Sequence, residues 1–194
     1  MQNRNGKNMC KILHEENGNY MMVCTNVLNA TDELHELYNK NAGSMLSDVD
    51  FIIEDENNFI FVEYKNAAVS DASAPNAFQP SQDTAVKKIA RKFYDSLHYL
   101  MLMPQETGKP LDYVYILEYP NGDSVTRKSI REKIARYLPF AIQNAIQKKH
   151  SSTKTIIREF MVLSIAEWNK QYPKYQLVAN NTGQPPSPTL PKSK

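Results

Sequence analysis

Residues 48–65 constrain the fold more than any other part of the chain. Two strand-like segments, residues 48–54 and 59–65, are rich in Phe, Ile and Val and flank the turn-rich stretch 55–58. A four-residue loop between them predicts an antiparallel hairpin in which Glu54 faces Phe59. Extended along the hairpin, this register sets Asp50 opposite Glu63.

Two opposed carboxylates in a hairpin need compensation. Directly opposed side chains have Cβ atoms roughly 5 Å apart, and like charges so placed destabilise a sheet. Strand alternation puts Glu63 on the same face as Phe59 and Phe61, so this carboxylate adjoins an apolar row. Hard oxygen ligands predict a Mg²⁺ or Mn²⁺ site at Asp50 and Glu63. Lys65, on the same face, would orient a water or stabilise charge on a phosphate.

The remaining segments alternate between helical and strand-like patterns. Thr31 is a favourable N-cap for a first helix. In a later segment, residues 85–101, apolar residues recur at helical spacing, and the basic residues of that segment, Lys92 included, lie elsewhere on the helical wheel. The helices are predicted at residues 31–41, 85–101, 127–149 with a break at Pro139, and 166–172. Further strands are predicted at residues 112–119 and 156–165, with 20–28 as an additional candidate. This order predicts an α/β domain with a central mixed sheet flanked by helices.

The length of 194 residues favours one domain, assigned to residues 1–179. Residues 66–83 show no periodicity and are interpreted as a long functional loop, such as a lid. The Pro- and Lys-bearing residues 180–194 are predicted to be a disordered tail. No apolar run approaches the roughly 20 residues that a membrane helix needs, and no secretory signal is visible, so the cytoplasm is the expected compartment.

Charge is distributed unevenly along the chain. Residues 1–83 hold 13 acidic and 5 basic side chains, whereas residues 127–158 hold 9 basic side chains and one acidic one. This asymmetry suits a cation site beside a polyanion-binding surface, although a solvated helix face would also explain the basic segment.

The hairpin resembles the PD-(D/E)xK nuclease superfamily. Residues 47–53 (SDVDFII) and 59–65 (FIFVEYK) are similar to the Asp strand and the ExK strand of that superfamily. The resemblance implies a restriction-endonuclease-like core and metal-dependent hydrolysis of phosphodiester bonds, usually in DNA. It also implies that Asp50, Glu63 and the carbonyl of Tyr64 are metal ligands and that Lys65 is catalytic. The sequence departs from the pattern because no Pro precedes the Asp and residues 42–47 leave almost no room for an expected strand.

The resemblance also implies supporting residues. Glu33 is preferred to Glu36 as the glutamate on the first helix, and Gln82 or Lys88 would supply the polar residue on the next helix. The residues expected to meet nucleic-acid phosphates are Lys87, Lys88, Arg91, Arg127, Lys128 and Arg131.

Two other functions remain open. One is a catalytically inactive nuclease-like domain that binds nucleic acid or serves as a scaffold. The other is a nucleotidyltransferase, because Gly43-Ser44 followed by Asp48 and Asp50 resembles the GS and DxD signature of the polymerase-β-like family. A homodimer is compatible with the nuclease interpretation, but the sequence identifies no dimer face.

Overall fold

The computed structural model describes residues 9–67, 78–103, 108–120 and 122–180. Much of the segment interpreted as a lid, residues 66–83, and all but the first residue of the predicted tail, residues 180–194, lie outside these ranges. None of the helices in the described ranges has the length and apolarity needed to cross a bilayer.

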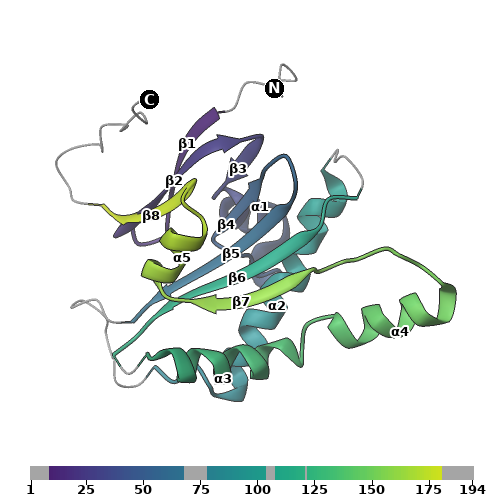
Figure 1. Ribbon diagram of the computed structural model, residues 1–194. Coiled ribbons are helices and arrows are strands. Elements are labelled where there is room, and N and C mark those ends of the chain that lie inside the picture. Colours follow the sequence, from purple (N-terminus) through teal and green to yellow (C-terminus); the bar gives the residue numbers. More distant parts are fainter. Residues whose placement is uncertain (1–8, 68–77, 104–107, 121, 181–194) are drawn as a thin grey trace, which may run out of the picture.

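A five-stranded mixed sheet forms the centre of the structure (Figure 1). Neighbouring strands are antiparallel from β3 to β5 and parallel from β5 to β7. In spatial order the strands are β3 (Asn29–Thr31), β4 (Phe51–Glu54), β5 (Phe59–Asn66), β6 (Leu111–Glu118) and β7 (Glu159–Leu163). The expected α/β class with a central mixed sheet flanked by helices is therefore confirmed.

Five helices and a second sheet complete the described structure. The helices are α1 (Leu34–Ala42), α2 (Asp83–Leu102), α3 (Ser124–Ala135), α4 (Phe140–His150) and α5 (Ile165–Gln171), and a short 3-10 turn, η1 (Gly43–Met45), follows α1. The second sheet is antiparallel, with the order β1 (Met9–His14), β2 (Tyr20–Val27) and β8 (Tyr175–Ala179).

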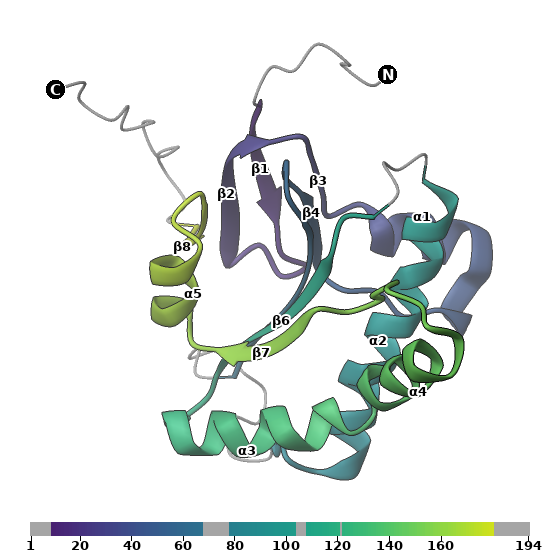
Figure 2. The ribbon, with the colours of Figure 1, turned by 45° about the vertical axis from the view of Figure 1, so that its right-hand side comes forward.

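The central sheet is buried on both faces (Figure 2). One face packs against α1, α2 and α3, in a core that includes Phe61, Phe93 and Ile130. The other face packs against the small sheet and α5, where Met22 and Trp168 are fully buried. Helix α4 extends beyond the edge of the sheet in Figure 1.

The predicted hairpin register is confirmed. Glu54 pairs with Phe59, and the ladder continues to Phe51 and Val62. Strand β4 begins at Phe51 and not at Asp48, because the preceding backbone bonds to α2. The amides of Ser47 and Val49 donate to the side chains of Asp95 and Ser96, at 2.9 and 3.0 Å.

The first helix begins later than predicted. Thr31 belongs to β3, and its hydroxyl accepts a hydrogen bond from the amide of Glu33 at 3.1 Å, so α1 starts at Leu34. The candidate strand at residues 20–28 is present as β2, whereas the prediction missed β1, β3 and β8.

Candidate functional site

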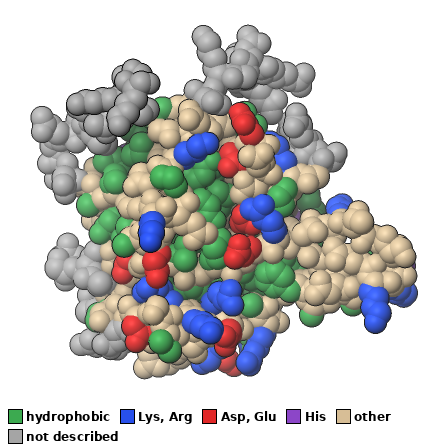
Figure 3. Space-filling view, in the orientation of Figure 1, with side chains coloured by type: hydrophobic (Ala, Val, Ile, Leu, Met, Phe, Trp, Pro, Cys, Tyr) green, Lys and Arg blue, Asp and Glu red, His purple; other side chains and the backbone are tan. Residues whose placement is uncertain are grey.

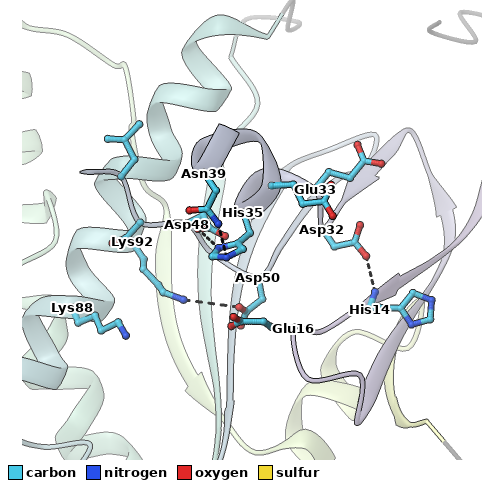
Figure 4. Close-up of a pocket in the computed structure, with 13 residues that line it drawn as sticks. His14, Glu16, Asp32, Glu33, His35, Asn39, Asp48, Asp50, Lys88 and Lys92 are labelled. Carbon is cyan, nitrogen blue, oxygen red and sulfur yellow. Dashed lines mark hydrogen bonds and ion pairs between the residues drawn. The ribbon is translucent and has the colours of Figure 1, made fainter. Parts of the chain in front are cut away.

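A polar cleft of about 630 Å³ lies where α1, α2 and the approach to β4 meet the end of β1 (Figure 4). Carboxylates dominate its lining, with two lysines opposite them. The charged side chains are Glu16, Asp32, Glu33, Glu36, Asp48, Asp50, Lys88 and Lys92. Because acidic groups outnumber ammonium groups, the cleft attracts cations.

Asp50 and Glu63 lie beside this cleft on the face of the central sheet that α2 covers. Glu63 continues the row of Phe59 and Phe61 along β5, and its side chain is 7% exposed. Asp50 immediately precedes β4, and its Oδ2 accepts a hydrogen bond from the amide of Tyr64 at 2.6 Å. This side-chain bond replaces the next backbone hydrogen bond between the two strands and holds the carboxylate against β5.

Lys92 of α2 bridges the two carboxylates. Its Nζ lies 2.8 Å from both carboxylate oxygens of Glu63 and 3.9 Å from Oδ1 of Asp50. Figure 4 shows the side chain reaching from α2 toward Asp50. The sequence analysis placed Lys92 outside the apolar stripe and gave it no role, whereas in the structure its side chain is only 17% exposed and pairs with the two carboxylates.

One ammonium shared by two carboxylates leaves an excess negative charge when both carboxylates are ionised. Burial, reinforced by the charge of Asp50, raises the pKa of Glu63 to about 8, although Lys92 opposes the shift. Burial likewise raises the pKa of Asp50. Burial alone would lower the pKa of Lys92, but the two carboxylates more than offset this and raise it. The cluster therefore favours an additional positive charge.

Lys65 lies on the same strand face as Glu63 but farther along β5. Its side chain is exposed, and its Nζ is 5.8 Å from the centre of the Phe78 ring. Its distance from the carboxylates follows from strand geometry, because two residues along a strand span roughly 6.6 Å. Of the two lysines, Lys92 is the one in contact with the acidic pair.

Asp48 is held toward α1. Its Oδ1 lies 3.1 Å from Nδ1 of His35, and Nε2 of the same ring lies 2.8 Å from the side-chain amide nitrogen of Asn39. Because that amide nitrogen can only donate, Nε2 accepts and Nδ1 carries the proton given to Asp48. Asp50, and not Asp48, is therefore the carboxylate next to Glu63.

The structure places three of the helix residues named in the sequence analysis in the lining of the cleft and one outside it. Glu33 and Lys88 both line the cleft, on opposite sides of Asp50 in Figure 4. Glu36 lines the cleft as well. The side chain of Gln82 donates to Gln79 at 2.7 Å, at the start of α2.

The predicted phosphate-binding residues also differ in exposure. Lys87, Lys88, Arg91, Lys128 and Arg131 are exposed. Arg127 is buried, because its guanidinium donates to the carbonyl of Gly122 and pairs with Glu167 at 3.0 Å. In Figure 3 basic side chains are interspersed with acidic ones over the lower half of the face shown and recur at the end of α4. The ion pair of Arg127 with Glu167 joins α3 to α5.

The donor set fits an ion that keeps most of its water ligands better than an ion bound by protein ligands alone. In the described part of the chain, no group of three or more His, Cys, Asp or Glu side chains is placed to hold a metal ion together. Mg²⁺ needs only one or two protein carboxylates, because it retains several waters. Asp50 and Glu63 supply that number, and the Lys92 ammonium lies between them.

No protein-family model, curated protein or solved structure matches this chain. The inference of a function therefore rests on the chemistry of the cleft and on the topology around it.

Proposed function

We propose that this protein is a metal-dependent nuclease with a restriction-endonuclease-like core that hydrolyses phosphodiester bonds, with DNA as the expected substrate. The observation that carries the proposal is the pair of carboxylates, Asp50 directly before β4 and Glu63 on β5, that share a single ammonium. Such a pair is costly to bury unless a cation completes it.

The order of elements around the hairpin supports the proposal. Helix α1, the β4–β5 hairpin, α2 and the parallel strand β6 follow one another as in the core of the PD-(D/E)xK superfamily. One departure is that β3, which pairs with β4, precedes α1 instead of following it. This position explains why residues 42–47 need no strand.

In the proposed centre, Asp50, Glu63 and the carbonyl of Tyr64 would hold Mg²⁺ or Mn²⁺, which would supply Lewis acidity and an activated water. Glu33, which lines the cleft, would orient the attacking water. Lys65, exposed farther along β5, and Lys88, exposed in the cleft, would neutralise charge on the scissile phosphate.

The proposed substrate contacts extend over two helices. The exposed residues Lys87 and Arg91 on α2, with Lys128 and Arg131 on α3, would meet the phosphate backbone. Arg91 already pairs with Asp95 at 3.1 Å, so it contributes less than the others. The cytoplasm is the proposed compartment, and a homodimer would allow cleavage of both strands.

Cleavage assays test the proposal. The protein is incubated with supercoiled, linear and branched DNA in Mg²⁺, in Mn²⁺ and in EDTA. Cleavage that needs metal, and that is lost in Lys65→Ala but kept in Lys170→Ala, supports it. Lys170 is a matched control because it is exposed on α5, on the other face of the central sheet. No cleavage of any substrate contradicts the proposal.

A second candidate is an inactive nuclease-like domain that binds nucleic acid or acts as a scaffold. The bidentate contact of Lys92 with Glu63 favours it, because a permanent ammonium would replace the metal. Such a domain would shift DNA in a salt-dependent way without cutting it.

The nucleotidyltransferase alternative has less support. Asp48 and Asp50 both line the cleft, yet only four residues without regular secondary structure separate the turn η1 from Asp50, and Asp48 pairs with His35. Incorporation of a labelled nucleotide would identify this activity.

A further inference from the structure

Lys92 is unusually placed for a lysine on an amphipathic helix. It lies three residues after Ile89 and four before Ser96, both of which are buried against the central sheet. Its stem therefore follows the buried side of α2, and the ammonium emerges at the acidic pair. The contacts at 2.8 Å to both oxygens of Glu63 hold it there.

The charge balance of this cluster is incomplete. With both carboxylates ionised, as metal ligands must be, one ammonium leaves a single negative charge, whereas one divalent cation brings the sum to zero. The position midway between Glu63 and Asp50 can hold one cation at a time, because Nζ already lies at contact distance from Glu63 and 3.9 Å from Asp50. An ammonium and a metal ion in that space would repel each other strongly.

We propose that Lys92 sets the metal affinity of the Asp50–Glu63 centre, because its ammonium occupies the cation position in the metal-free protein and must leave it before a divalent ion binds. This inference rests on the proposed metal centre and adds a competitor for it within the same chain.

The cleft provides a place for the displaced ammonium. Lys92 lines the cleft, and so do the carboxylates of Asp48 and Glu16. Rotation about the flexible stem moves Nζ from the carboxylate pair into this acidic space, next to Lys88. There it adds to the positive charge facing an incoming phosphate, so metal binding and substrate binding become coupled through one side chain.

Calorimetric titration with Mn²⁺ tests the proposal without any measurement of activity. The variants are Lys92→Met, which keeps the length of the stem and removes the charge, and Lys88→Met, which removes an exposed charge from the same cleft. We expect the dissociation constant for Mn²⁺ to fall by about tenfold or more in Lys92→Met, and by less than about threefold in Lys88→Met. An equal effect of the two variants overturns the proposal, since it would reflect only the net charge of the cleft.

Glu63→Gln distinguishes failure of the proposed metal centre from failure of the proposed role of Lys92. If this variant abolishes Mn²⁺ binding while Lys92→Met leaves the wild-type affinity unchanged or weakens it, the metal centre stands and the role of Lys92 is refuted. If neither the wild type nor Lys92→Met binds Mn²⁺, both proposals fail.

Lys92→Arg covers the case in which Lys92→Met does not fold without metal. Arginine keeps the charge and can also bind Glu63 through two hydrogen bonds, so we expect Mn²⁺ binding no tighter than in the wild type. Tenfold tighter binding by Lys92→Arg contradicts competition by the cation. Folding of Lys92→Met only when Mn²⁺ is added, followed by circular dichroism, supports it.

Discussion

Removal of the Lys92 ammonium should destabilise the metal-free protein in a way that depends on pH. In Lys92→Met the buried carboxylates lose their cation, and the folded state must take up one more proton than the wild type does. Proton uptake at pH 7 by a carboxyl whose ordinary pKa is about 4 spans three pH units of about 1.36 kcal/mol each, or about 4 kcal/mol. This figure agrees with the 3–5 kcal/mol, roughly, that breaking a buried ion pair costs.

The direction of the pH dependence follows from linkage. In the folded variant the pKa of this carboxyl is raised above its value in the unfolded chain, as burial already raises those of Asp50 and Glu63. The stability of such a group is fully present below its unfolded pKa and is lost as the pH rises through its folded pKa. The penalty relative to the wild type should therefore shrink to about 1–2 kcal/mol at pH 5.

Urea unfolding in EDTA at pH 5, 6 and 7 measures this penalty. Lys88→Met is the control, because Lys88 is exposed and lines the same cleft. A penalty for Lys92→Met that is the same at pH 5 and pH 7, or one below about 1 kcal/mol at pH 7, would show that the buried carboxylates do not need the Lys92 cation.

Three further predictions concern the two carboxylates and the core between the central sheet and the small sheet. The affinity for Mn²⁺ should rise between about pH 6 and pH 9, because a proton held by Glu63, whose pKa is raised to about 8, must leave as the metal binds; a pH-independent calorimetric affinity contradicts this. Asp50→Asn should raise the melting temperature in EDTA, because a neutral side chain relieves the buried charge and still accepts from the Tyr64 amide; a lower melting temperature contradicts it. Trp168→Ala should destabilise the protein by about 3–5 kcal/mol in urea unfolding, because the ring is fully buried and its Nε1 donates to the carbonyl of Tyr175 at 2.6 Å; a loss below about 1 kcal/mol would contradict its role as an anchor.

The sequence predicts the hairpin well because its determinants are local. The length of the loop at residues 55–58 and the alternation along residues 59–65 together define the register, and the observed pair of Glu54 and Phe59 agrees with it. That register also predicts that Asp50 lies near Glu63, and in the structure both carboxylates lie within 4 Å of the Lys92 ammonium, Asp50 at 3.9 Å and Glu63 at 2.8 Å.

The second sheet escaped prediction because its strands come from opposite ends of the chain. Strands β1 and β8 are short, and each is stabilised by pairing with β2. No local pattern in residues 9–14 or 175–179 indicates that partner, since strand pairing over long sequence separations depends on tertiary packing.

Lys92 was missed because the helical wheel assigns lysines to solvent by default. A signal was nevertheless present, since Lys92 lies between Ile89 and Ser96 on the side of α2 that is buried. A lysine in such a position needs an acidic partner. Asp50 and Glu63, already placed on the neighbouring hairpin, were the available carboxylates.

Nicking of supercoiled DNA by the wild type and by Glu63→Gln, followed against Mg²⁺ concentration, is the decisive assay for a metal-dependent nuclease centred on Asp50 and Glu63. We expect nicking that rises with Mg²⁺, stops in EDTA and falls by about a hundredfold or more in the variant, because a metal ligand is lost. Equal nicking by the two proteins, or nicking that persists in EDTA, would contradict a metal-dependent nuclease centred on Asp50 and Glu63.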